Sequence, residues 1–97
     1  MNAGDVARLR KRLRMNRSHF AKLCGVDART VTRWETTDGP RPTGAAAAVM
    51  TAIQEKLDGD PKGAARVIKF LAGAAALGGL AYVLLKLLGN VDSKENE

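Results

Sequence analysis

The sequence predicts an all-α protein of four to five helices, and two observations carry the prediction. Apolar residues recur at spacings of three and four through most of the chain, which is the period of an α-helix. A residue suited to capping a helix N-terminus stands before most of these stretches, at Asn16, Asp27, Thr43 and Asp60. A chain of 97 residues suffices for one small domain and an appendage.

The first expected helix covers residues 5–14, with Asp5 as its cap and an apolar face of Val6, Leu9 and Leu13. Two short helices over residues 17–24 and 28–35 follow.

Residues 36–42 form a loop, because Gly39 and two prolines stop any helix there. Thr43 caps a fourth helix that ends at Leu57, and its spacing gives these core candidates: Ala46, Val49, Met50, Ile53 and Leu57. Asp58-Gly59 ends it, and Asp60-Pro61 starts a last helix.

The segment from Asn16 to Glu35 is the most informative part of the chain. Gly25 separates its two short helices at a point where a left-handed backbone angle lets the chain reverse. The inward faces are Phe20, Ala21 and Cys24 on the first helix, and Val31 and Trp34 on the second. Two short helices joined by a tight turn predict a helix-turn-helix, whose second helix is shaped to enter a DNA major groove.

The positive charge of the chain is unevenly distributed. Residues 1–57 hold 11 Lys/Arg and 5 Asp/Glu, whereas residues 58–97 hold 5 of each, so the net charge of +6 belongs to the first part. A basic domain attracts phosphate through counterion release, which favours a duplex-DNA partner. Anionic membranes and acidic proteins attract the same charge.

The outward face of the second short helix supplies the candidate base contacts: Ala28, Arg29, Thr32 and Arg33. Arginine can bind the O6 and N7 edge of guanine bidentately, and Ala28 and the Thr32 methyl can touch thymine methyls. For the phosphates we expect contacts from Arg17, Arg14 and Arg41, with Arg17 foremost because it begins a helix whose free amides point toward an anion. The alternative is that the basic run of residues 8–17 is only a solvated surface.

The span from Val6 to Leu57 resembles the DNA-binding domain of the phage Cro and repressor family, also called the XRE family. The matching pattern is Phe20-Ala21, Gly25-Val26, Val31, Trp34-Glu35 and Pro42. The resemblance implies a lambda-repressor-like fold in a bacterial or phage protein, with Arg10 and Glu35 in a largely buried structural ion pair. The family commonly has glutamine where this chain has Arg17, and the loop TTDGPR is slightly longer than usual.

The chain turns apolar near its C-terminus. Val67–Leu88 comprises 22 residues in which only Lys69 and Lys86 are charged. A helix of that length spans roughly 33 Å, close to the bilayer core. The sequence therefore predicts four parts: a helix-turn-helix domain over residues 1–58, a linker over 59–66, one apolar helix over 67–88 and a polar tail over 89–97. We interpret the apolar helix as a transmembrane anchor.

The alternative for the apolar helix is a buried oligomerisation helix. Small residues recur four apart, as in Ala74/Gly78, and such spacing lets two helices approach closely in lipid, so anchoring and dimerisation are compatible. The charge bias places the N-terminus in the cytoplasm, on the inner face of the membrane. Without the anchor the protein would be cytoplasmic.

These observations predict a transcriptional regulator that binds duplex DNA as a homodimer or higher oligomer, tethered to the membrane by the apolar helix. A repressor that multimerises through that helix, and a structural protein that reuses the fold for protein contacts, are the alternatives. We expect no enzyme, cofactor or metal site, because His19 and Cys24 have no third group beside them and no phosphate loop or carboxylate pair occurs.

Overall fold

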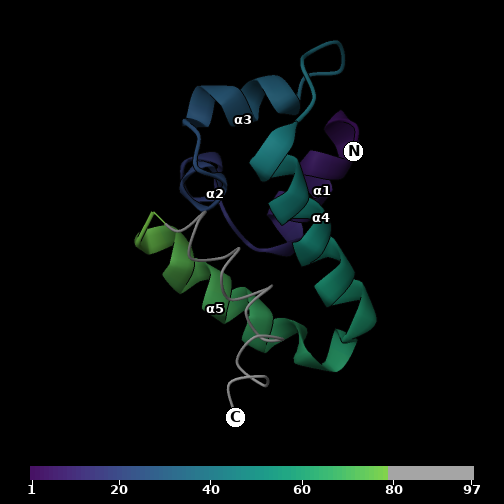
Figure 1. The fold of residues 1–97 in the computed structure, drawn as a ribbon, viewed down its shortest axis with the longest axis vertical. Coiled ribbons are helices and arrows are strands. Elements are labelled where there is room, and N and C mark those ends of the chain that lie inside the picture. The colour runs from purple at the N-terminus through teal and green to yellow at the C-terminus, as the bar shows by residue number, and fades with distance from the viewer. Residues whose placement is uncertain (79–97) are drawn as a thin grey trace.

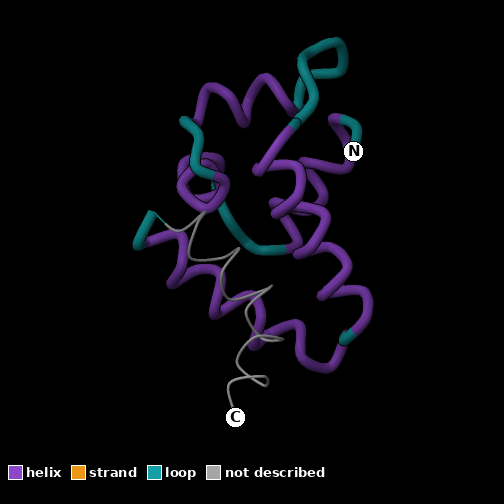
Figure 2. The backbone as a smooth tube through the Cα atoms, in the orientation of Figure 1, coloured by secondary structure: helices purple, strands orange, loops and turns teal. Residues whose placement is uncertain are grey.

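The computed structural model describes residues 1–78, and this part of the chain is all-α, as predicted (Figure 2). It holds five α-helices and one 3-10 turn, and no strand occurs within residues 1–78. The helices are α1 (Ala3–Arg12), α2 (Arg17–Cys24), α3 (Ala28–Trp34), α4 (Gly44–Gly59) and α5 (Ala64–Ala76), and the 3-10 turn covers Pro61–Gly63.

The pair α2 and α3 forms as the sequence predicts. The Asn16 side chain accepts a hydrogen bond from the His19 amide at 2.7 Å, and the Asp27 side chain accepts one from the Thr30 amide at 2.8 Å. Gly25 takes φ +75°, and the Val26 amide donates to the Ala21 carbonyl at 2.9 Å, which closes α2 in a Schellman turn. The expected inward faces of both helices are buried.

The first helix lies two residues earlier than expected, because its N-cap is Asn2 and not Asp5. The Asn2 side chain accepts from the Asp5 amide at 2.8 Å, while the Asp5 carboxylate accepts from the Asn2 amide at 2.9 Å. This reciprocal arrangement is a capping box, and it places Asp5 in the third helical position. The helix ends at Arg12, and Arg14, expected inside it, takes φ +60° in the connection to α2.

The fourth helix buries all of its expected core residues and ends at Gly59, two residues beyond Leu57. Thr43 is its N-cap residue, but the Thr43 side chain makes no capping hydrogen bond. Asp60 caps as predicted, accepting from the Gly63 amide at 3.1 Å, although this bond closes the short 3-10 turn that precedes α5.

The fifth helix packs against α2 and α4 and closes one core shared by all five helices. Figure 1 shows α2 between α3 and α5, with α4 running along one side of the molecule. Leu71 is fully buried, Ala74 and Ala75 are buried with it, and partly buried apolar side chains of α5 pack against the same core: Ala64, Val67, Ile68 and Phe70. Small side chains at the contact let the helices approach closely.

The prediction of one apolar helix over residues 67–88 is therefore corrected. α5 ends at Ala76, inside that stretch, and Gly78 takes φ +70°, a left-handed conformation that an α-helix does not continue through. The expected linker, residues 59–66, contains the end of α4, the 3-10 turn and the start of α5. The rest of the apolar stretch, residues 79–88, and the tail, residues 89–97, lie outside the described residues.

Among residues 1–78, no helix combines the length and the hydropathy that crossing a bilayer requires.

Candidate nucleic-acid interface

The third helix has two distinct faces. Val31 is fully buried and Trp34 is 7% exposed, so both fix the helix to the core. Arg29, Thr32 and Arg33 are exposed on the other face, and Ala28 beside them is half-buried. The four candidate base contacts thus lie at the accessible side of a helix whose opposite side is anchored.

Arg29 and Arg33 have no carboxylate partner within residues 1–78. The acid nearest to Arg29 along the chain, Asp27, is occupied by its capping bond, and the acid nearest to Arg33, Glu35, is bonded to Arg10 and Arg17. That bond to the Thr30 amide holds the pKa of Asp27 below its ordinary value, and the charges of Arg29 and Arg33 lower this pKa further. The two arginines therefore keep their charge and their hydrogen-bond donors available to an external acceptor.

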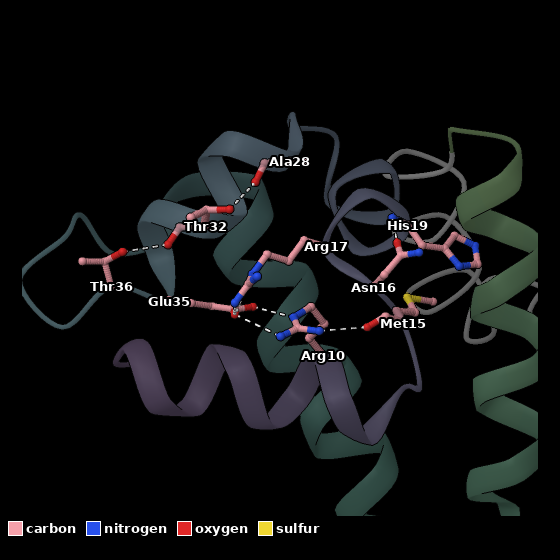
Figure 3. A network of polar contacts seen from close by, with 9 residues as sticks. All are labelled: Arg10, Met15, Asn16, Arg17, His19, Ala28, Thr32, Glu35 and Thr36. Carbon is pink, nitrogen blue, oxygen red and sulfur yellow. Dashed lines mark hydrogen bonds and ion pairs between the residues drawn. The ribbon is translucent and has the colours of Figure 1, made fainter.

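Thr32 uses its hydroxyl proton locally, since its Oγ1 donates to the Ala28 carbonyl at 3.1 Å (Figure 3). Thr36 donates in the same way to the Thr32 carbonyl at 2.9 Å and so closes the end of α3. The Thr32 methyl and the hydroxyl lone pairs remain for contacts outside the helix.

The structure places Arg10 and Glu35 together, in the pairing that the resemblance implies. Arg10 Nε donates to Glu35 Oε2 at 2.6 Å, and Arg10 Nη2 donates to Glu35 Oε1 at 3.1 Å (Figure 3). A third bond runs from Arg10 Nη1 to the Met15 carbonyl at 3.1 Å. The Glu35 side chain is 5% exposed and the Arg10 side chain 12%, so the pair ties α1 to the end of α3 in a nearly dry environment.

Arg17 joins the same carboxylate, which the sequence analysis did not anticipate. Its Nε donates to Glu35 Oε1 at 3.1 Å, its Nη2 lies 3.0 Å from the same oxygen, and half of its side chain remains exposed. Burial alone would raise the pKa of Glu35, but hydrogen bonds from Arg10 and Arg17 outweigh it and bring this pKa below its ordinary value. Together the side chains of Arg10, Arg17 and Glu35 carry a net charge of +1, and Arg17 is the exposed member of the three.

The other two candidate phosphate contacts lie in connections. Arg14 is exposed between α1 and α2, and Arg41 is exposed in the loop after α3. Arg41 and Thr37 line a shallow groove against the start of α1, with Asn2, Gly4 and Arg8 on its opposite wall. Neither Arg14 nor Arg41 has an ion-pair partner within the described residues.

Most of the basic run in α1 is neutralised by acids. Arg8 pairs with Asp5, and Arg12 pairs with Asp58 at 2.8 Å. Only the Arg8 partner, three residues away, lies at a spacing that sequence inspection detects. The Asp58 and Glu35 partners come from distant parts of the chain, so nothing local signals them.

The remaining reactive groups are buried or isolated. Burial raises the pKa of the Cys24 thiol to about 12, so this cysteine is an inert core residue at neutral pH. Within residues 1–78 no group of His, Cys, Asp and Glu side chains is arranged to hold a metal ion.

Comparison of the chain with protein-family models, with curated proteins and with solved structures gives no match.

Proposed function

We propose that this protein is a sequence-specific duplex-DNA-binding regulator of the Cro and repressor type, in which α3 enters the major groove. The observation that carries the proposal is the pair of exposed arginines on α3, Arg29 and Arg33, which lack any acidic partner in the described part of the chain although the helix is firmly held from behind. Arginines on a rigid helix match the O6 and N7 acceptors of guanine.

The phosphate contacts of the proposal come from Arg17, Arg14 and Arg41, all exposed. Arg17 is the first residue of α2, where the Asn16 cap leaves the amides of Arg17 and Ser18 without an acceptor inside the helix. These amides and the Arg17 side chain add donors for one phosphate beside the groove.

We propose that two copies bind one site. α3 has seven residues and is therefore about 10 Å long, which matches only about three base pairs along the groove. Specific recognition then needs a second α3 on a half-site about one helical turn away, as in other dimeric helix-turn-helix proteins. A footprint confined to one groove segment of a few base pairs would contradict the dimer.

The proposal assigns α5 to the DNA-binding domain and not to a membrane anchor. An anchor over residues 67–88 would have to withdraw Leu71, Ala74 and Ala75 from the core, where all three are buried. Recovery of the expressed protein only with detergent would contradict this assignment.

The test is a matched pair of double variants in a duplex-binding titration at several salt concentrations. Arg29→Ala with Arg33→Ala removes the two candidate base contacts. Lys62→Ala with Arg66→Ala removes the same charge from two exposed positions, one in the 3-10 turn just before α5 and one at the start of α5. In Figure 1 that start lies at the end of the molecule opposite α3. The probe is the tightest duplex recovered by selection from a random pool.

We expect the α3 variant to lose at least about thirtyfold in affinity for the selected duplex and most of its preference over a mixed-sequence duplex, because each of the two bidentate contacts discriminates by about 1–3 kcal/mol. The control variant should change affinity by no more than about threefold. Equal losses in the two variants, or an absence of salt-dependent binding to any duplex, would refute the proposal.

A further inference from the structure

The triad of Arg10, Arg17 and Glu35 has more connections than a structural ion pair needs. Arg10 alone satisfies Glu35, since it reaches both carboxylate oxygens, at 2.6 and 3.1 Å. Arg17 nevertheless directs two nitrogens at Oε1, at 3.1 and 3.0 Å, while its side chain stays half exposed. One edge of the Arg17 guanidinium is thus held by a buried carboxylate, and Nη1 has no partner within residues 1–78.

We propose that Glu35 is a positioning residue for Arg17: it holds one edge of the guanidinium so that the other edge is presented to a backbone phosphate of duplex DNA beside α3. The inference rests on the proposed function and specifies how one phosphate contact is built. Glu35 itself touches no DNA in this arrangement, and it acts through the orientation of Arg17.

The physical basis is the flexibility of an arginine at a surface. An exposed arginine samples many rotamers and loses that freedom when it binds a phosphate. Arg17 is already ordered by Glu35, and Glu35 is itself fixed by Arg10, which also holds the Met15 carbonyl at 3.1 Å. Arg10 and Glu35 are nearly buried, whereas half of the Arg17 side chain is exposed. Figure 3 shows the contacts that join the three side chains.

Charge and orientation predict opposite effects when Glu35 is neutralised. Glu35→Gln raises the net charge of the triad from +1 to +2, which by electrostatics alone strengthens attraction to DNA. If Glu35 orients Arg17, the same substitution weakens binding despite the added positive charge. The sign of the change therefore separates the two explanations.

Asp58→Asn is the matched control. Asp58 pairs with Arg12 at 2.8 Å through an exposed contact at the end of α4, so its neutralisation also adds one positive charge and also frees an arginine. Asp58 lies in the last turn of α4, and the end of α4 lies away from α3 in Figure 1. Asp58→Asn is expected to leave affinity unchanged or to raise it by up to about twofold.

The experiment measures the dissociation constant of a fluorescent 24-base-pair duplex of mixed sequence, since a phosphate contact does not depend on sequence. Arg17→Ala should weaken binding of the native protein about tenfold and lower the salt slope by about 0.9. Glu35→Gln should weaken it about fivefold or more, and Arg17→Ala added to Glu35→Gln should cost less than a further twofold. Glu35→Gln behaving like Asp58→Asn, with Arg17→Ala still costing tenfold in its presence, would overturn the inference.

A measurement on the native protein covers the case in which Glu35→Gln does not fold. The Nε–H resonance of Arg17, assigned by its loss in Arg17→Lys, should stay slowly exchanging when the 24-base-pair duplex saturates the protein, because Arg17 keeps Glu35 while it binds phosphate. Fast exchange of this proton in the complex would overturn the inference and leave the proposed function intact. A native protein that binds no duplex would overturn both.

Discussion

The burial of Leu71 gives a prediction about where the folded domain ends. Leu71 lies in α5 and is fully buried, whereas Leu77, one residue beyond the end of α5, is 76% exposed. Leu71→Ala and Leu77→Ala delete the same atoms from one buried and one solvated position. If α5 belongs to the core, only the first deletion leaves a cavity.

Leu→Ala substitutions at fully buried sites cost about 3–5 kcal/mol, and α5 covers an outer side of the domain, so we expect about 3 kcal/mol for Leu71→Ala. At a urea m-value of about 1 kcal/mol/M for a domain of this size, the midpoint falls by about 3 M. Leu77→Ala should change the free energy of unfolding by less than about 0.5 kcal/mol.

The assay is urea unfolding followed through Trp34, the single tryptophan of the chain, which is buried in α3. Far-UV circular dichroism monitors the helices in parallel, and coincident transitions would show that α5 unfolds with α3. Equal midpoints for Leu71→Ala, Leu77→Ala and the native protein would refute the placement of α5 in the core.

Three further predictions concern the backbone and pH. A Cβ atom at Gly39 would overlap the carbonyl oxygen of Arg33, so Gly39→Ala should destabilise the protein by about 1–3 kcal/mol. Gly59 has open space around it, so Gly59→Ala should be neutral or stabilising. Thermal unfolding of the two variants measures the difference in stability. Arg14→Gly should stabilise the fold by up to about 1 kcal/mol, because φ +60° strains a residue with a side chain. The same substitution should weaken duplex binding, because it removes a cation. Equal stability of the variant and the native protein would contradict the strain at Arg14. The pKa of Glu35 lies below its ordinary value of 4.5, so its contribution to stability is present above that value and is lost as the pH falls through the lowered pKa. The free energy of unfolding should therefore drop as the pH is lowered from about 5, and Glu35→Gln should flatten this dependence.

Local signals predicted α2, α3 and the turn between them well. Asn16 and Asp27 cap their helices and Gly25 adopts the left-handed angle, because each effect acts within three or four residues of the chain. The apolar spacing of α4 likewise identified every buried residue of that helix. Short-range chemistry determines these features, and the sequence displays it directly.

The C-terminal helix could not be assigned from the sequence alone. A run of alanine, glycine and leucine has the same composition whether it faces lipid or a protein core, and hydropathy does not distinguish the two environments. The structure buries Leu71, Ala74 and Ala75 against α2 and α4 and ends the helix at Ala76. The outcome depends on packing between parts of the chain about 50 residues apart, which no local pattern encodes.

The candidate site was predictable in its residue types and, through the family resemblance, in the pairing of Arg10 with Glu35, but the contact of Arg17 with Glu35 was not. Arg29 and Arg33 lie exposed on α3, where the helical period places them. Arg17 was expected to be free for phosphate, yet it shares Glu35 with Arg10 across 18 residues of sequence. Whether an arginine is free or already held depends on where a distant carboxylate lies in the fold.

The proposed function requires that Arg29 and Arg33 contact guanines in the major groove. Methylation interference tests it most directly, because a methyl group on guanine N7 blocks the acceptor that an arginine would use. With a selected duplex, we predict interference at guanines of each half-site, and Arg29→Ala and Arg33→Ala should each relieve it at a different guanine. Tight binding with no interference at any guanine, or interference that neither substitution relieves, would show that these arginines do not read guanines in the major groove.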